Sequence, residues 1–286
     1  MEGKAIDAGE FRAGQRRSWN SAASGWEKWM SFTEAAAAPV SRRLVELAGV
    51  APGHRVLDVA CGYGEPSFTA ARAVAPGGHV VATDISAEML AAGRERAERE
   101  GVANVEFVES AAAALDLEPQ SFDAAVSRWG LIFEPDGEAV ATHLRAFLKP
   151  GARFAISSWG SPERVPWIGL PMRTVLGRLH APPPPPGAPG PLSRPTVEAI
   201  GGLLEGGGFE GVAAEEIEID FEWESPDQFT EFCHDIIAPL RMLIDQHPED
   251  VQRDAWAAVT DAAREVAGGD RPLTMTNVVL FASGRA

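Results

Sequence analysis

Two carboxylates and two glycines stand at spacings that suit the binding of a ribose-bearing ligand. Asp58 ends an apolar run, Gly62 and Gly64 follow at once, and Asp84 comes about 20 residues later, at the end of a second apolar run. Glycine adopts positive φ and lets ligand atoms approach the backbone, and the helix expected after the turn points its positive end at it. A carboxylate at position 84 can accept both hydroxyl protons of a ribose.

Asp58 favours one class of ribose-bearing ligand over another. The pattern Gly62-x-Gly64-x-x-Ser67 is a loose match to the dinucleotide fingerprint and is weak on its own. A carboxylate at position 58 disfavours a pyrophosphate and suits the cationic ammonium of a methionine moiety, directly or through water. Asp58 could also tie down the loop by accepting backbone N–H bonds, and the two roles can coexist. The residues therefore point to S-adenosylmethionine more than to a nicotinamide dinucleotide.

The elements that position these residues alternate in type along the chain. Strands are predicted at 54–60, 79–86, 105–110, 122–129, 152–159, 211–223 and 274–286, and helices at 9–49, 64–75, 87–101, 137–151 and 196–209. Such alternation predicts βαβ units, and a parallel sheet binds ligands beyond the carboxyl ends of its strands. The predicted fold is α/β: a Rossmann-like, doubly wound, seven-stranded, mostly parallel sheet with helices on both faces and a helical cap.

Four regions follow from this pattern. They are N-terminal helices covering the cofactor (1–50), a cofactor-binding core (51–160), a proline-rich lid or linker (161–195), and a segment that completes the sheet (196–286) with two cap helices at about 226–268 broken at Pro248. The middle region contains five consecutive prolines, Pro182 to Pro186. Because proline lacks an N–H, we expect residues 161–195 to be irregular.

Composition excludes several kinds of partner. The 286 residues include 25 Lys and Arg against 41 Asp and Glu, a net charge of −16, which repels nucleic acid and anionic membranes. Cys61 and Cys233 form no metal-spaced pair, so we expect no metal site and no disulfide framework. No apolar run nears the roughly 20 residues that cross a bilayer, and residues 1–19 lack a signal core. We expect a cytoplasmic protein without membrane insertion, and the sequence leaves its oligomeric state open.

Four stretches together resemble the motifs of class I S-adenosylmethionine-dependent methyltransferases. They are VLDVACGYG (56–64), ATDIS with AEML (82–90), SFDAAVSRWGLIFEPD (121–136) and LKPGARFAISSW (148–159). Their order and spacing fit that family across residues 19–160. The nearest relatives belong to the ubiquinone/menaquinone-biosynthesis-like group, which also includes small-molecule and natural-product methyltransferases.

The resemblance implies a role for individual residues. Asp58, Ala60, Gly62 and Gly64 would surround the methionine part, Asp84 would hold the ribose, Ile85 and Met89 would contact the adenine, and Ser127 and Arg128 would lie near the sulfonium. A helix bearing Trp19, Trp26 and Trp29 would close over the cofactor, since an aromatic face attracts a sulfonium. Their spacings of seven and three would equally suit simple core packing.

Two positions depart from the family pattern. Ala60 stands where the family usually has glycine, so the turn could be displaced. Ala111 stands where relatives often have the aspartate that receives the adenine amino group. Backbone around Ala111 and Ala112 could still contact the ring edge, but one lost charge-assisted hydrogen bond would cost roughly 1.5–3 kcal/mol.

Methyl transfer to a small-molecule acceptor is the activity that the resemblance implies, most readily to oxygen, with nitrogen or carbon as alternatives, in quinone-like or natural-product metabolism. His234 and Asp235, in the expected cap, are the candidate general base, unless they are solvated helix residues. Trp129, Phe133 and Trp167 are candidates for an acceptor pocket, unless they only pack the core. Two other hypotheses stay open: a protein that binds S-adenosylmethionine without methyl transfer, and a nicotinamide-dependent oxidoreductase.

Overall fold

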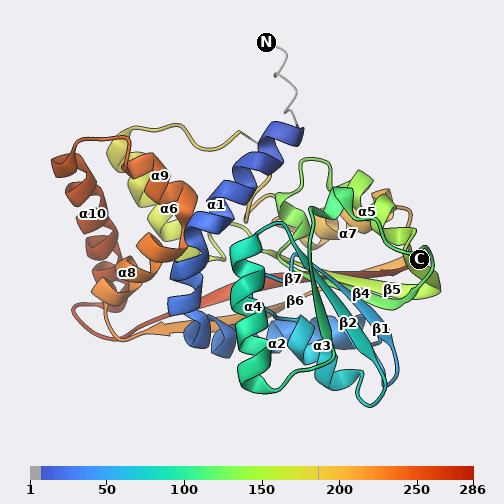
Figure 1. The fold of residues 1–286 in the computed structure, drawn as a ribbon. Helices are drawn as coiled ribbons and strands as arrows, with labels where there is room; N and C mark the ends of the chain where they lie inside the picture. Colours follow the sequence, from blue (N-terminus) through green and yellow to red (C-terminus); the bar gives the residue numbers. More distant parts are fainter. Residues whose placement is uncertain (1–7, 186) are drawn as a thin grey trace, which may run out of the picture.

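A seven-stranded sheet crosses the molecule in the order β3-β2-β1-β4-β5-β7-β6 (Figure 1). The structure is a computed structural model that describes residues 8–185 and 187–286; residues 1–7, in the first predicted region, and Pro186 lie outside the described residues. The strands are β1 Arg55–Val59, β2 His79–Asp84, β3 Val105–Glu109, β4 Phe122–Arg128, β5 Leu148–Trp159, β6 Glu210–Trp223 and β7 Leu273–Arg285. The first five pair in parallel and β7 runs antiparallel between β5 and β6, which confirms the predicted fold class.

Helices cover both faces of this sheet. They are α1 Ala8–Lys28, α2 Met30–Leu47, α3 Ser67–Ala73, α4 Ala87–Glu100, α5 Gly137–Arg145, α6 Pro166–Leu179, α7 Val197–Gly206, α8 Pro226–Ile236, α9 Ala238–Ile244 and α10 Glu249–Ala267, with short 3-10 turns at Ala112–Ala114 and Leu131–Phe133. Alternate strand residues face opposite sides. Val56 and Val80 pack on the side of α2 and α3, while Leu57 and Val81 pack on the side of α5 and α7.

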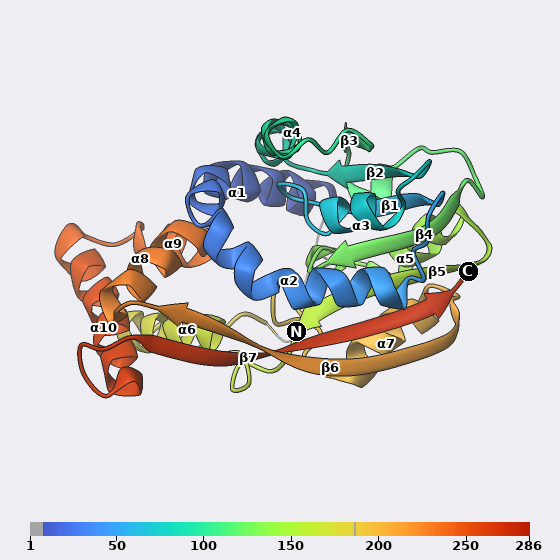
Figure 2. The same cartoon turned by 90° about the horizontal axis from the view of Figure 1, so that it is seen from below.

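The last two strands extend beyond the rest of the sheet. β5 ends at Trp159, opposite Val279, whereas β7 also contains residues 273–278, which pair with the last residues of β6. Six residues of strand span roughly 20 Å. Figure 2 shows β6 and β7 running out to helices α6, α8, α9 and α10. Trp223 and Phe229 are fully buried there, so this overhang forms the floor on which the cap packs.

β6 is an edge strand with an acidic outward face. It pairs only with β7 among the described strands, and its exposed positions include Glu216, Glu218, Asp220 and Glu222. Residues between them are buried or half-buried, as the alternation Ile217, Ile219, Phe221 and Trp223 had predicted.

Three expectations about the second half of the chain are wrong in detail. Residues 161–195 are not irregular throughout, because residues 166–179 form α6; Pro166 lies in its first turn, where a missing N–H costs nothing. The cap has three helices in 226–268, with an added break at Ile237. The helix expected at 137–151 ends at Arg145, and β5 begins at Leu148.

Helix α1 lies between the sheet and the cap (Figure 1). It contacts α4 on one side and α8 and α9 on the other. It crosses α8 at Gly25, where a Cβ atom would overlap the backbone carbonyl of Asp235. Within the described part of the chain, no helix is both long and apolar enough to cross a membrane.

Replacing Gly25 by alanine should loosen the crossing of α1 and α8. We expect Gly25→Ala to cost about 1–3 kcal/mol of unfolding free energy, because the Cβ forces two backbones apart. Gly14→Ala is the control on the same helix, since its Cβ would meet only Arg17 Nη2 at 4.0 Å; helix propensity should make it neutral or stabilising by up to about 1 kcal/mol. Urea denaturation measures both, and equal stability of the two variants would contradict this packing.

Candidate functional site

A cavity of about 1340 Å³ opens at the carboxyl ends of β1, β2 and β4, under α1 and beside the cap. Single-ligand pockets typically measure about 300–1000 Å³, so this space has room for two ligands side by side. One side is lined by the strand ends and α1, and the other by the cap and the proline-rich loop after α6. No group of three or more potential metal ligands is found among the described residues.

The turn after β1 forms one wall of the cavity. Its two positions, 62 and 64, require glycine for different reasons. Gly62 has φ 55°, lines the cavity, and a Cβ built on it would meet nothing within 4 Å. Gly64 has φ 117° and does not line the cavity. A Cβ built on Gly64 would overlap the ring of Phe68, so glycine is needed there for packing. Gly62 therefore keeps space for a ligand, whereas Gly64 serves internal packing.

Ala60 has a positive φ although it carries a Cβ atom. It has φ 61°, and Trp129, across the sheet at the end of β4, has φ 58°; for residues other than glycine this region costs about 1–2 kcal/mol. The extra Cβ is accommodated by Gly130, where a second Cβ would lie 2.5 Å from that of Ala60. Gly130, two residues after the end of β4, thus leaves room for the Cβ of Ala60.

Asp84 is held rigidly at the end of β2 and lines the cavity. Its Oδ2 accepts the Gly62 N–H at 2.9 Å, and its Oδ1 accepts the Ser86 N–H at 2.8 Å. Burial raises the pKa of this carboxyl, against the lowering effect of those N–H groups. Each oxygen keeps a second lone pair, so the carboxylate can still accept hydroxyl protons from a ligand.

Asp58 does not line the cavity, which corrects its expected contact with a ligand. Its side chain is fully buried within β1, and its Oδ2 accepts a hydrogen bond from Ser67 Oγ at 2.5 Å, at the start of α3. Among the described residues Asp58 Oδ1 has no hydrogen-bond partner. Burial raises the pKa of Asp58 to about 7, although the Ser67 bond lowers it. Asp58 therefore ties the end of β1 to the start of α3.

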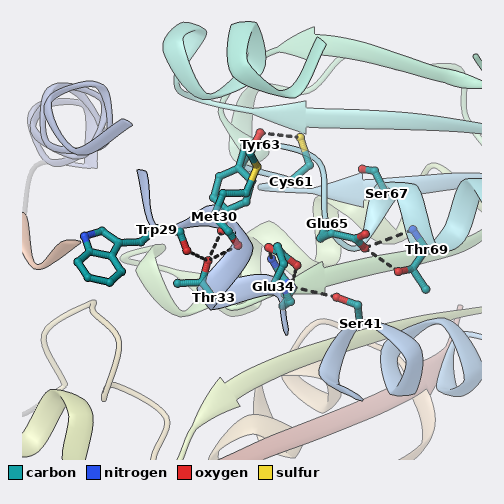
Figure 3. A network of polar contacts seen from close by, with 12 residues as sticks. Trp29, Met30, Thr33, Glu34, Ser41, Cys61, Tyr63, Glu65, Ser67 and Thr69 are labelled. Atoms are coloured by element: carbon teal, nitrogen blue, oxygen red, sulfur yellow. Dashed lines mark hydrogen bonds and ion pairs between the residues drawn. The ribbon is translucent and has the colours of Figure 1, made fainter. Parts of the chain in front are cut away.

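A buried ion pair joins α2 to the end of β4. Arg128 donates to both oxygens of Glu34, at 2.8 and 2.5 Å, and to Ser41 Oγ at 3.0 Å. The two side chains are 9% and 13% exposed, and both residues line the cavity. Burial alone would raise the pKa of Glu34, but the Arg128 guanidinium lowers it below its usual range. Figure 3 shows Thr33 and Glu34 facing Tyr63 and Glu65 of the turn, with Thr33 Oγ1 2.8 Å from the Tyr63 hydroxyl.

Sequence comparison assigns the part of the chain that carries these residues. Residues 30–166 match the sequence model of the ubiE/COQ5 methyltransferase family. The match covers just under half of the chain, and over these residues the chain is similar to that family. The UbiE ubiquinone/menaquinone biosynthesis C-methyltransferase of Pseudomonas putida is 38% identical over 122 residues, 42% of this chain and 48% of that protein. An uncharacterized protein of Mycobacterium tuberculosis is 37% identical over 128 residues, 45% of each chain. The chain thus spans about half the length of the curated relatives it matches.

Solved structures match a larger share of the chain. The [4+2]-cyclase SpnF has a TM-score of 0.55 at 18% identity, covering 88% of this chain and 81% of its own. Geranyl diphosphate C-methyltransferase from Streptomyces coelicolor A3(2) has a TM-score of 0.52 at 14% identity, covering 99% and 100%. At these identities the likeness shows the fold alone.

The strand ends and α1 bring most of the predicted cofactor residues to one side of the cavity. Those that line it are Trp19, Ala60, Gly62, Asp84, Ile85, Met89, Ala111, Ala112 and Arg128. Gly64 and Ser127 do not: Ser127 is fully buried and its Oγ donates to the Val59 carbonyl at 2.8 Å. Trp29 also lies outside the cavity, because its Nε1 donates to Asp235 Oδ2 at 2.9 Å.

The candidate general base is misplaced. α8 turns Phe232 and Ile236 towards the cavity, so His234 lies on the opposite side, with its side chain 49% exposed. Asp235 is bound by Lys28 Nζ at 2.6 Å and by the Trp29 indole, which lower its pKa although burial raises it. Both residues join α8 to the end of α1 and are absent from the cavity wall.

The cap side of the cavity is apolar and aromatic. The three predicted pocket residues, Trp129, Phe133 and Trp167, all line it. Trp129 stacks on Trp159 at 4.3 Å between ring centroids, and the wall also contains Met172, Phe221, Phe232 and Leu240. The described lining residues of the whole cavity include no histidine and no lysine.

Sequence reasoning missed several polar residues of the wall, among them Tyr63, Glu65 and Glu34. Tyr63 and Glu65 lie inside the glycine turn itself, so their position in CGYGEP was a usable signal. Glu34 gave no such signal, since it stands in an ordinary helical stretch and only the fold brings α2 against β4.

The Ala60–Gly130 contact should appear as coupled stabilities. We expect Gly130→Ala to cost about 1–3 kcal/mol, because its Cβ would overlap that of Ala60, and Ala60→Gly to be near neutral. The double variant should regain at least about 0.5 kcal/mol relative to the sum of the two changes. Urea denaturation of the four proteins measures the coupling, and strict additivity would contradict the proposed compensation.

Asp58 should make the unliganded protein less stable as pH rises. The native state keeps the Asp58 proton up to a pKa of about 7, whereas the unfolded chain releases it near 3.8, so stability is lost from about pH 4 to about pH 7. From pH 5 to pH 8, wild type should lose about 1–3 kcal/mol relative to Asp58→Asn.

Asp123→Asn is the control for this titration, since hydrogen bonds from the Arg55 N–H and Lys149 lower the Asp123 pKa despite partial burial. Asp123 is ionised in both the folded and the unfolded state above pH 5. The difference in unfolding free energy between wild type and Asp123→Asn should therefore stay constant from pH 5 to pH 8. A constant difference for Asp58→Asn as well would refute the buried titration.

Proposed function

We propose that this protein transfers a methyl group from S-adenosylmethionine to a small-molecule acceptor. The single observation that carries the proposal is the two-sided cavity at the strand ends of the segment similar to the ubiE/COQ5 methyltransferase family, with a polar cofactor side and an apolar acceptor side. A structural neighbour with a TM-score of 0.51, the Haemonchus contortus phosphoethanolamine N-methyltransferase 2, was solved with S-adenosyl-L-methionine.

The residues present suit this cofactor. The open space above Gly62 is where a Cβ would intrude, and the backbone there can approach a ligand. Asp84 has free lone pairs for the ribose hydroxyls, and Ile85 and Met89 offer an apolar surface for the adenine. Ser110, Ala111 and Ala112 line the same side, so their backbone is available to the ring edge in place of the missing aspartate.

The acceptor side sets what kind of nucleophile can react. The bound cofactor supplies an electrophilic methyl group, and the chain supplies alignment and exclusion of water. The described wall lacks histidine and lysine, so a general base would have to be a carboxylate such as Glu65 or Glu163. An acceptor that ionises readily, or is nucleophilic without a base, is therefore the one that this wall suits best. A phenolic or enolic oxygen on an apolar, quinone-like or natural-product skeleton meets this condition best; carbon or nitrogen acceptors are the alternatives.

The test is direct binding followed by turnover. Calorimetry with S-adenosylmethionine, S-adenosylhomocysteine and NAD should show binding of the two sulfur compounds alone. A panel of apolar phenols, quinols and amines is then assayed for S-adenosylhomocysteine release. Binding of NAD alone, or no binding at all, would refute the proposal, and binding without turnover on any acceptor would favour the non-transferring alternative.

Asp84 should carry a measurable share of cofactor affinity. We expect Asp84→Asn to weaken S-adenosylhomocysteine roughly 10- to 100-fold, because an amide replaces a charged acceptor for the ribose hydroxyls. Asp123→Asn is the matched control: Asp123 also accepts a backbone N–H, at 2.9 Å, but at the opposite end of the strands. Unchanged affinity of Asp84→Asn by calorimetry would contradict the ribose assignment.

A further inference from the structure

The Glu34–Arg128 pair is built more rigidly than structural stability requires. A buried ion pair seldom stabilises a fold relative to apolar residues of the same size. This one has a bidentate contact, a third bond to Ser41, and a place in the wall of a cavity rather than in the packed core. A preorganised pair of opposite charges at a cavity wall is what a ligand with opposite charges side by side would need.

Both members of the pair keep bonding capacity for such a ligand. Arg128 has five N–H donors, of which three are engaged by Glu34 and Ser41. Each oxygen of Glu34 accepts one bond from Arg128, and the Tyr63 hydroxyl also hydrogen-bonds to this carboxylate, which still leaves a lone pair for a ligand. Asp58, the residue that sequence reasoning had placed against an ammonium, is covered and does not line the cavity. Glu65 also lines the cavity, but it accepts a bond from Thr69 and lies near Arg72 and Arg96. Glu34 is therefore the carboxylate beside Arg128 that can take an ammonium.

The strand order sets how far apart the ligand groups lie. Neighbouring strands are about 4.8 Å apart, and the order β3-β2-β1-β4 places Ala111, Asp84, Gly62 and Arg128 in succession along one edge of the sheet. Three strand spacings make about 14 Å, comparable to an extended S-adenosyl amino acid. With adenine at β3 and ribose at β2, the sulfur falls at β1 and the amino-acid end at β4.

We propose that the Glu34–Arg128 ion pair is the receptor for the zwitterionic amino-acid end of the cofactor. Arg128 pairs with the α-carboxylate and Glu34 with the α-ammonium, so that ligand and ion pair form a four-charge arrangement of alternating sign. The proposal rests on the proposed function, because it assigns one end of the same cofactor. The assignment of the ion pair goes beyond the proposed function, because it names the residues that distinguish an S-adenosyl amino acid from a thioether nucleoside without the amino-acid end.

A comparison of two ligands tests the proposal without an activity assay. S-adenosylhomocysteine carries the amino-acid end, and 5′-methylthioadenosine keeps the nucleoside and sulfur but lacks that end. In wild type, the first should bind more tightly. In Glu34→Gln/Arg128→Met, which leaves neither charge unpaired, the affinity ratio of the two ligands should fall roughly 10- to 100-fold, while the affinity for 5′-methylthioadenosine stays within about twofold.

Glu134→Gln is the matched control, because Glu134 also lines the cavity in an ion pair, with Arg12 at 3.1 Å, but on the α1 side. It should leave the ligand ratio unchanged. If the double variant also leaves the ratio unchanged, or weakens both ligands equally, the pair is only structural and the proposal fails. If wild type binds neither ligand, the proposed function itself fails, which is a distinguishable outcome.

Decarboxylated S-adenosylhomocysteine separates the two charges. It keeps the ammonium and lacks the carboxylate, so Glu34→Gln should weaken it, and adding Arg128→Met should weaken it no further. A larger loss on removal of Arg128 than of Glu34 would overturn the assignment of each charge. Thermal melting of every variant confirms that a folded protein is compared, and Glu34→Gln alone, which keeps an oxygen for Arg128, serves if the double variant does not fold.

Discussion

The buried ion pair between Glu34 and Arg128 links the sheet to the helices that surround the cavity. It fixes α2 against the end of β4, and α2 in turn packs on β4, β5, β6 and α3. Because α1 leads directly into α2 at Trp29, the position of the helix that roofs the cavity follows from the position of α2. One charged contact thereby connects the sheet, the roof and the wall of the site.

The second constraint is the unequal length of the strands. β1 and β3 contain five residues each, while β6 and β7 contain 14 and 13. The short strands end where the cofactor side of the cavity begins, and the long pair continues past that edge to carry the cap. The apolar acceptor side exists because Phe221 on the overhang and Phe232 on α8 close a space that the short strands leave open.

Local sequence patterns predicted the sheet and the cofactor residues at the carboxyl ends of its strands. They failed for residues whose position depends on contacts between distant segments of the chain. The glycine turn and Asp84 could be placed because strand periodicity and βαβ alternation act over a few tens of residues. The contact of Asp58 was misjudged because its hydrogen-bond partner, Ser67, lies beyond the turn, at the start of α3. The path of that turn cannot be seen in the sequence. His234 was misjudged because the side of α8 that faces the cavity depends on the elements it packs against, and the sequence does not show which elements these are. Glu34 was missed because its partner stands 94 positions away.

The outer edge of β6 has a consequence for how these molecules behave in concentrated solution. A free strand of this length is a template onto which another chain could add. Glu216 is paired with Arg164, but the exposed Glu218, Asp220 and Glu222 still make two such strands repel each other, so β6 resists cross-β stacking as long as these acids stay ionised and unscreened. Acidification or high salt would remove that protection, and colloidal behaviour should worsen under those conditions before the fold itself is lost.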